Sequence, residues 1–134
     1  MDEMLKSVLA DTNEAPSRDD LIRAFQEQFG DSDDMLNLFS LRSGKVIVQN
    51  AAAQSQIGYD DNDIQDKSIS DFHPEDQRIK AEMAFRQMLR FGFAEAEVTM
   101  YLKSGELATL LLRSFLIQRV PEAICLTHTV RITL

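Results

Sequence analysis

The chain has 134 residues, a length that suits one domain and leaves no room for a second full one. Hydrophobic residues make up 44% and charged residues 27% of it, which is ordinary for a globular protein and excludes disorder for most of the chain. The formal net charge of -8 opposes contact with phosphate backbones and with anionic membranes, so we expect neither a nucleic-acid nor a membrane partner.

The single cysteine and the start of the chain indicate the compartment. Cys125 has no second cysteine with which to form an internal disulfide, and it lies in an apolar run where a buried, unreactive thiol is expected. No apolar stretch approaches the ~18 residues that span a bilayer. Asp2 and Glu3 stand where a secretory signal carries basic residues. These features predict a cytoplasmic protein.

Residues 1–33 are expected to form an amphipathic helical extension that caps the domain and contributes to dimerisation. Apolar residues at helical spacing indicate a first helix over about residues 4–9, and Pro16 interrupts the pattern. Ser17 is suited to cap a second helix, and Gly30 is suited to end it. The apolar face of this second helix carries Leu21, Ile22, Phe25 and Phe29.

Residues 34–134 are expected to form one α+β domain. Asn50 is suited to cap a helix that ends near Gly58, and Gly92 is suited to end the longest helix. Because the first and last strands are distant in sequence, pairing them gives a five-stranded antiparallel sheet with helices on one face. The expected elements are strands 35–41 and 45–49, helix 51–58, a turn-rich stretch 60–71, helix 74–91 and strands 94–102, 107–118 and 123–134.

Several short motifs follow one another between residues 44 and 133. They read GKVIVQNAAA at 44–53, IGY at 57–59, FHPED at 72–76, EVTMYLKSGE at 97–106 and VRIT at 130–133. In order and spacing they resemble the motifs of the PAS family: G-x-I-x-x-x-N-x-A, hG-Y/F, hHPED, E-x-R-x-x-x-K-D-G and D-I-T. Ser104 and Arg131 stand where the family often has Asp, so no role of those carboxylates is carried over.

The resemblance implies a PAS sheet with short helices that cup a small pocket. It also implies signal sensing and dimerisation upstream of a kinase, cyclase or transcription module, in cis or in trans, as in two-component systems. We therefore expect a sensory or interaction domain that binds a small ligand or mediates dimerisation, and no enzyme activity. The expected pocket walls are Val48, Ile57, Ile69, Phe72, Met83, Met88, Val98, Met100, Leu112 and His128.

The strand over 109–117 is apolar on both faces, so both faces of the sheet must be covered. The second face is covered by the N-terminal helix, by a partner subunit, or by both. A homodimer would bring the helix residues Leu21, Ile22, Phe25 and Phe29 together with Leu111, Phe115 and Ile117.

No catalytic, metal or cofactor set is predicted. His73 is expected to stabilise a turn rather than act as a base, and no C-x-x-C or H-x-x-x-H spacing indicates zinc. The N-C-R-F-L segment of flavin photosensor PAS domains is missing, and residues 77–91 carry no histidine for haem. An unidentified small molecule is the one ligand considered.

Two alternatives stay open at this stage. One is a homodimerisation module without ligand, whose core is filled by its own side chains. The other is a small cavity enzyme with a ketosteroid-isomerase-like fold, which would need a buried carboxylate or a Tyr–Asp pair facing the cavity. Glu95 and Glu97 fall on the polar face of their strand, which disfavours the enzyme.

Overall fold

The computed structural model describes residues 17–132, with the side chains of Ile69 and Ser70 excepted. The helix expected over residues 4–9 therefore lies outside the described residues. Neighbouring strands of the five-stranded sheet are antiparallel, in the order β2-β1-β5-β4-β3, so the first strand pairs with the last as predicted. The strands are β1 (Met35–Ser40), β2 (Val46–Gln49), β3 (Phe93–Tyr101), β4 (Leu107–Gln118) and β5 (Ile124–Arg131).

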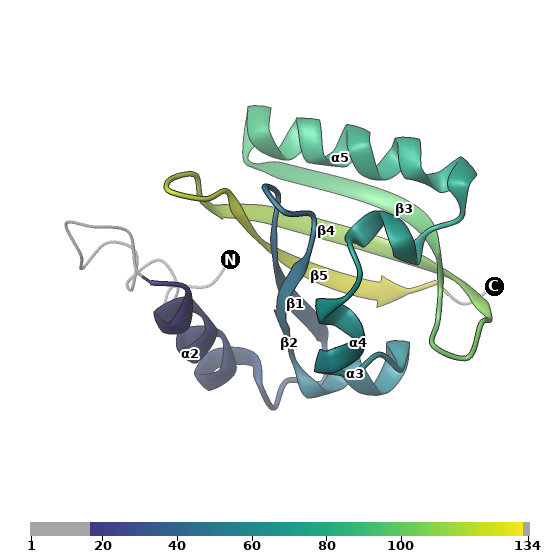
Figure 1. Cartoon of the computed structure of the whole chain (residues 1–134), viewed down its shortest axis with the longest axis horizontal. Helices are drawn as coiled ribbons and strands as arrows, with labels where there is room; N and C mark the ends of the chain where they lie inside the picture. Colours follow the sequence, from purple (N-terminus) through teal and green to yellow (C-terminus); the bar gives the residue numbers. More distant parts are fainter. Residues whose placement is uncertain (1–16, 133–134) are drawn as a thin grey trace.

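Helices lie on both sides of this sheet (Figure 1). The helix α2 precedes the sheet, and the remaining helices fill the connection between β2 and β3. The helices are α2 (Arg18–Phe29), α3 (Ala51–Ile57), α4 (Asp61–Gln65) and α5 (Arg78–Phe91), with 3₁₀ turns η1 (Ile69–Phe72) and η2 (Glu75–Gln77) before α5.

Four of the predicted helix caps are confirmed. The Ser17 hydroxyl accepts a hydrogen bond from the Asp20 N–H at the start of α2, and the Asn50 side chain accepts one from the Ala53 N–H at the start of α3. Gly58 and Gly92 end α3 and α5 with φ of 91° and 79°, in the left-handed region that favours glycine.

The longest helix begins at Arg78, four residues later than the sequence predicts. The preceding segment is held against the edge strand β3 instead. The Gln77 carboxamide oxygen accepts from the Thr99 N–H at 3.2 Å, and the His73 ring contacts the Thr99 carbonyl oxygen at 3.0 Å. These two bonds to one residue of β3 give the segment a 3₁₀ turn in place of a helical one.

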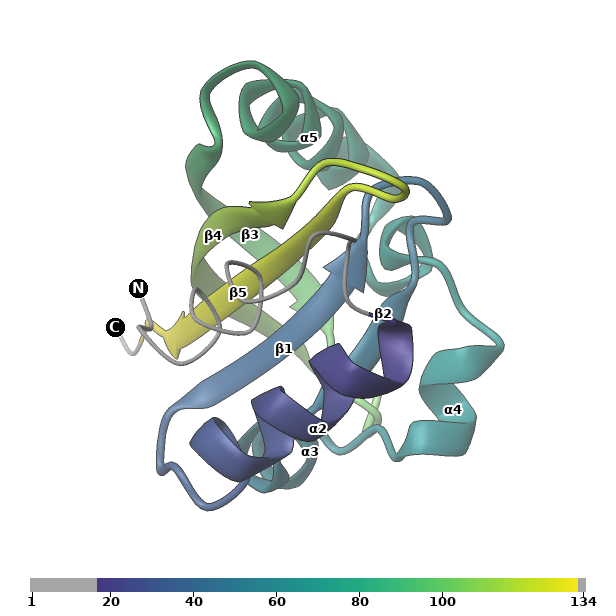
Figure 2. The same ribbon diagram turned by 90° about the vertical axis from the view of Figure 1, so that its left-hand side faces the viewer.

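The α2 helix lies across the outer face of the sheet, over β1 (Figure 2). Leu21 and Phe25 are buried there against residues of β1 and β5 such as Leu38 and Leu126. Arg18 Nη2 also donates to both oxygens of Glu122, at 2.9 Å each, which fixes the start of α2 to the loop after β4.

The expected dimer contact is therefore wrong for three of its residues. Leu21, Phe25 and Ile117 are buried within one chain, so they do not face a second subunit. Ile22 and Phe29 are half-buried against the same cluster. The physical reason is that α2 folds back on its own sheet and covers the apolar faces of β1 and β5.

The buried side of α5 is not the side that carries most of its large apolar residues. Ile79, Met83 and Leu89 are exposed, whereas Ala81 and Met88 are buried. Small alanine side chains let this helix approach the inner face of the sheet closely. Alanine contributes little to a hydrophobic pattern. The larger apolar residues on the other side of the helix therefore dominate the pattern in the sequence.

Candidate functional site

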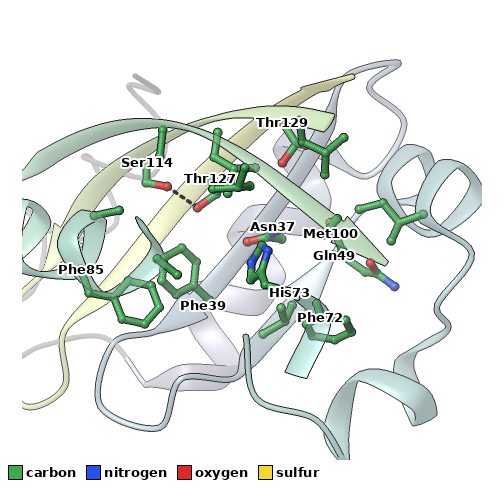
Figure 3. Close-up of a pocket in the computed structure, with 18 of the residues that line it drawn as sticks. Asn37, Phe39, Gln49, Phe72, His73, Phe85, Met100, Ser114, Thr127 and Thr129 are labelled. Atoms are coloured by element: carbon green, nitrogen blue, oxygen red, sulfur yellow. Dashed lines mark hydrogen bonds between the residues drawn. The ribbon is translucent and has the colours of Figure 1, made fainter. Parts of the chain in front are cut away.

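A pocket lies between the inner face of the sheet and the helices that follow β2. Its cavity volume is about 100 Å³. All five strands contribute to its wall, as do α5 and the segment around His73. Figure 3 shows Asn37 and His73 both pointing into this space.

The strand register places residues of different strands in rows across the pocket floor. Asn37 of β1 pairs with Gln49 on one side and with Thr127 on the other, and Thr127 pairs with Ser114. These four residues form a polar row across four strands. The neighbouring row through Phe39 is apolar, and the row on the other side carries one polar residue, Thr129, beside Leu112.

Most of the polar row is already satisfied by hydrogen bonds. Gln49 Nε2 donates to the Tyr59 carbonyl at 2.6 Å, and the Ser114 and Thr127 hydroxyls share a hydrogen bond of 2.8 Å. The exception is Asn37, whose Oδ1 is buried and has no hydrogen-bond partner among the described residues. A buried acceptor without a partner is rare in folded proteins, so this atom is a place where a donor is missing.

Aromatic pairs form much of the remaining wall. Phe39 and Phe85 stack at 5.6 Å between ring centroids, and Tyr59 and Phe72 meet edge to face at 4.9 Å. All four residues line the pocket. Such walls favour a planar or apolar ligand body.

One ring nitrogen of His73 forms a hydrogen bond within the protein, and the other does not. A carbonyl oxygen only accepts, so the 3.0 Å contact with Thr99 requires a proton on Nδ1. Burial lowers the pKa of His73 below its ordinary value; the bond to Thr99 opposes this, and the charge of Arg78 adds to it. The ring is consequently neutral at pH 7, and Nε2 carries a free lone pair.

The lining carries no charge. It contains no Asp, Glu, Lys or Arg. Its other titratable side chain is Tyr59, whose pKa is raised chiefly by burial, so the phenol stays protonated and its hydroxyl donates to the Tyr101 carbonyl at 3.0 Å. A charged ligand group would lie here without a counter-charge, which is costly in a buried site.

Six residues expected at the pocket do line it, namely Ile57, Phe72, Met88, Val98, Met100 and Leu112. Val48 and His128 lie on the other face of the sheet: Val48 packs in the cluster under α2, and His128 Nε2 is 3.8 Å from Asp34. Met83 is 55% exposed on the outer side of α5. The side chain of Ile69 lies outside the described residues.

The two misplacements on strands, Val48 and His128, have a simple cause. Alternation along a strand shows which residues share a face, but it does not show which face meets the helices. His128 does share a face with Ile124 and Leu126, as its spacing predicts, but that face is the outer one.

The sequence reasoning also missed the polar row and the small residues of α5. The available signal was the pair Thr127 and Thr129, two polar residues on one face of an otherwise apolar strand. Asn37 could be placed beside Thr127 only once the register of β1 and β5 was known.

The site is a poor fit for a flavin or a haem. Flavin nucleotides carry phosphate and haem carries carboxylates, and the lining offers no cation to either. Cys125 is fully buried behind the floor with Phe39 and Met88, and it does not line the pocket. Burial raises the pKa of its thiol to about 12. Pockets for drug-sized ligands measure roughly 300–1,000 Å³, well above the 100 Å³ found here.

Two further observations concern metals and membranes. Within residues 17–132, no group of three or more His, Cys, Asp and Glu side chains is placed to hold a metal ion. No helix of this part of the chain has both the length and the apolar character needed to cross a membrane.

No protein-family model and no curated protein matches the sequence. Solved structures match the fold instead. A PAS domain from Colwellia psychrerythraea aligns with a TM-score of 0.71 at 17% identity, over 84% of this chain and 98% of that one. A domain of a sensory box sensor histidine kinase/response regulator from Geobacter sulfurreducens gives 0.66 at 18% identity, over 80% and 90% of the two chains.

A Rhodobacter sphaeroides LOV protein is also similar, with a TM-score of 0.71 at 18% identity over 87% of this chain and 68% of that one. Together with the strand order and the helices between β2 and β3, these matches show that the chain has the PAS fold. The resemblance seen in the sequence motifs is thus confirmed at the level of fold.

Proposed function

We propose that this chain is a sensory PAS domain that binds a small molecule in the pocket over the polar row and passes the signal to an effector domain. The observation that carries this proposal is Asn37, because its buried Oδ1 lacks a donor while the other three residues of the polar row are hydrogen-bonded. Gln118 Oε1 is also buried without a partner, but Gln118 does not line the pocket, whereas Asn37 does.

The output is proposed to run through the sheet. The inner face of β5 contributes Thr127 and Thr129 to the pocket, and its outer face contributes Leu126 to the cluster under α2. A ligand that shifts β5 would therefore alter the packing of α2 on the opposite face. Two structural neighbours are domains of sensor histidine kinases, which supports a kinase as the effector, in cis or in trans.

The test is native mass spectrometry of the full chain purified from cells, together with its absorption spectrum. We expect a bound small mass and no flavin or haem band. The Ala96→Phe variant fills the pocket and should lose that mass, whereas Ala51→Phe, on an exposed position of α3, should retain it. A wild-type chain without bound mass would contradict the sensor. A band near 400–450 nm would contradict the ligand class.

A second candidate function, homodimerisation, is favoured by the outer face that α2 leaves uncovered. Phe93 and Val130 are exposed there, and Leu111 and Phe115 are half-buried. Phe93 and Phe115 contact each other at 5.1 Å between ring centroids. We propose this outer patch, defined by these four residues, as the dimer surface in place of the contact through Leu21 and Phe25.

Catalysis is not part of the proposal. A cavity enzyme would need a carboxylate facing the pocket, and the lining has none. Glu95 and Glu97 project from the outer face of β3 and are exposed; Glu95 forms a 2.9 Å ion pair with Arg113.

A further inference from the structure

We propose that the ligand is an uncharged molecule the size of one small ring, with a single edge bearing an N–H or O–H group that donates to Asn37. This inference rests on the proposed function and specifies the chemistry of the same pocket.

The floor needs a donor at one point. In the polar row, Gln49 is hydrogen-bonded to the Tyr59 carbonyl, and Ser114 is hydrogen-bonded to Thr127. Asn37, between Gln49 and Thr127 in the register, keeps an acceptor oxygen without a partner. A ligand that donates to Oδ1 removes the cost of a buried, unpaired acceptor.

The opposite wall also favours a ligand group that donates a hydrogen bond. With Nδ1 held by the Thr99 carbonyl, His73 presents Nε2 to its surroundings as an acceptor, and no described residue donates to it. Two acceptors on one pocket, Asn37 Oδ1 and His73 Nε2, both select ligands that carry hydrogen on nitrogen or oxygen.

The rest of the pocket limits charge and size. The lining has no cationic or anionic side chain, and the aromatic pairs around Phe39 and Phe72 surround the apolar part of the space. The cavity volume of about 100 Å³ is well below the roughly 300–1,000 Å³ of pockets that hold drug-sized ligands. One small ring with a polar edge matches these limits, and a nucleotide or a porphyrin does not.

The experiment uses three single-ring probes on the full chain: phenol and toluene, which are nearly equal in size, and the larger benzoate. Phenol and toluene differ by a hydroxyl in place of a methyl group, and benzoate adds a negative charge. Dissociation constants are measured by titration calorimetry at pH 7.5. We expect phenol to bind about tenfold more tightly than toluene, the effect of one good hydrogen bond, and benzoate to show no binding.

The matched variant is Asn37→Leu, which keeps a similar side-chain volume and removes the acceptor. It should bind toluene at least as well as phenol. The comparison of the three probes on the wild-type chain needs no variant, so it decides the question even if Asn37→Leu does not fold. A Phe91→Leu variant, on the exposed end of α5, should leave the wild-type order unchanged.

Three outcomes would overturn the ligand class: benzoate binding as tightly as phenol, toluene binding as tightly as phenol, or no binding of phenol. If mass spectrometry still finds a small molecule retained in the pocket, the sensor proposal survives any of these. If no molecule is retained and no probe binds, both proposals fail.

Discussion

At the scale of single residues, buried polar side chains connect segments that are distant in sequence. Asn50 is fully buried and makes four hydrogen bonds: its Oδ1 accepts from Leu36 and Ala53, and its Nδ2 donates to the Phe29 and Asp34 carbonyls. His73 joins the turn before α5 to β3 in the same way. Each of these side chains holds the frame around the pocket, because losing one leaves several buried groups unpaired.

The titration of His73 should make stability depend on pH. In the unfolded chain its pKa is about 6.5, and in the folded chain burial lowers that pKa. The unfolded state therefore takes up the proton first, so the free energy of unfolding should fall as pH decreases below about 6.5. Urea denaturation at pH 7.5 and at pH 5.5 measures this loss.

The control for this prediction is His73→Asn, whose amide can still donate to the Thr99 carbonyl but does not titrate. Its loss of stability between the two pH values should be clearly smaller than that of the wild-type chain. Equal losses would show that other groups cause the pH dependence.

At the scale of elements, side chains and loops cover the free edge of β3. Thr99 is bonded by Gln77 and His73, and the Tyr101 carbonyl is bonded by the Tyr59 hydroxyl. The turn after β3 continues this contact, because the Lys103 N–H donates to the Ile57 carbonyl at the end of α3. The end of β3 at Thr99 and Tyr101 therefore has few edge groups left to pair with another chain.

The contact between α3 and this turn requires glycine at position 58. A Cβ on Gly58 would lie 2.9 Å from Lys103 Cβ, whereas a Cβ on Gly105 would have no atom within 4 Å. Both residues have nearly the same φ, 91° and 89°. Both Ala variants carry a left-handed cost of about 1–2 kcal/mol, and Gly58→Ala adds the close contact.

We expect Gly58→Ala to lower the free energy of unfolding by at least about 1 kcal/mol more than Gly105→Ala does. Denaturation of the two variants and the wild-type chain by urea measures the difference. Equal effects would mean that the turn moves away from α3 without cost.

At the scale of the whole molecule, the two faces of the sheet carry different features. The inner face carries the pocket, and the outer face is divided between the half under α2 and the outer patch of Phe93, Leu111, Phe115 and Val130. Because both faces belong to the same strands, a change in the pocket can reach the outer patch without a flexible connection.

The proposed dimer predicts that charge on the outer patch weakens association. Val130 is 41% exposed in the patch, and Val120 is 75% exposed in the turn after β4. A two-fold dimer would bring both copies of a Val130→Lys side chain into one interface, so its dissociation constant should rise at least about tenfold. Val120→Lys should leave it unchanged.

Analytical ultracentrifugation of the three proteins over a range of concentrations tests this. A wild-type chain that stays monomeric at high micromolar concentration would contradict the dimer. A Val130→Lys variant that associates like the wild type would place the interface elsewhere.

The sequence by itself determined the order of elements, their caps and the PAS resemblance. These depend on local rules: Ser17 and Asn50 are good helix caps, glycine tolerates the left-handed conformation at positions 58 and 92, and alternation along β3 and β4 follows the pleat. Local signals were also enough to place six pocket residues, since large apolar side chains on the dry face of a strand tend to be buried.

Only the tertiary structure decided which face of the sheet meets the helices and which residues stand side by side. That choice moved Val48 and His128 to the outer face and buried Leu21 and Phe25 under α2 within one chain. It also brought Asn37 between Gln49 and Thr127, which are 12 and 90 positions further along the chain. The physical reason is that register and face are set by long-range pairing and packing, which no local pattern encodes.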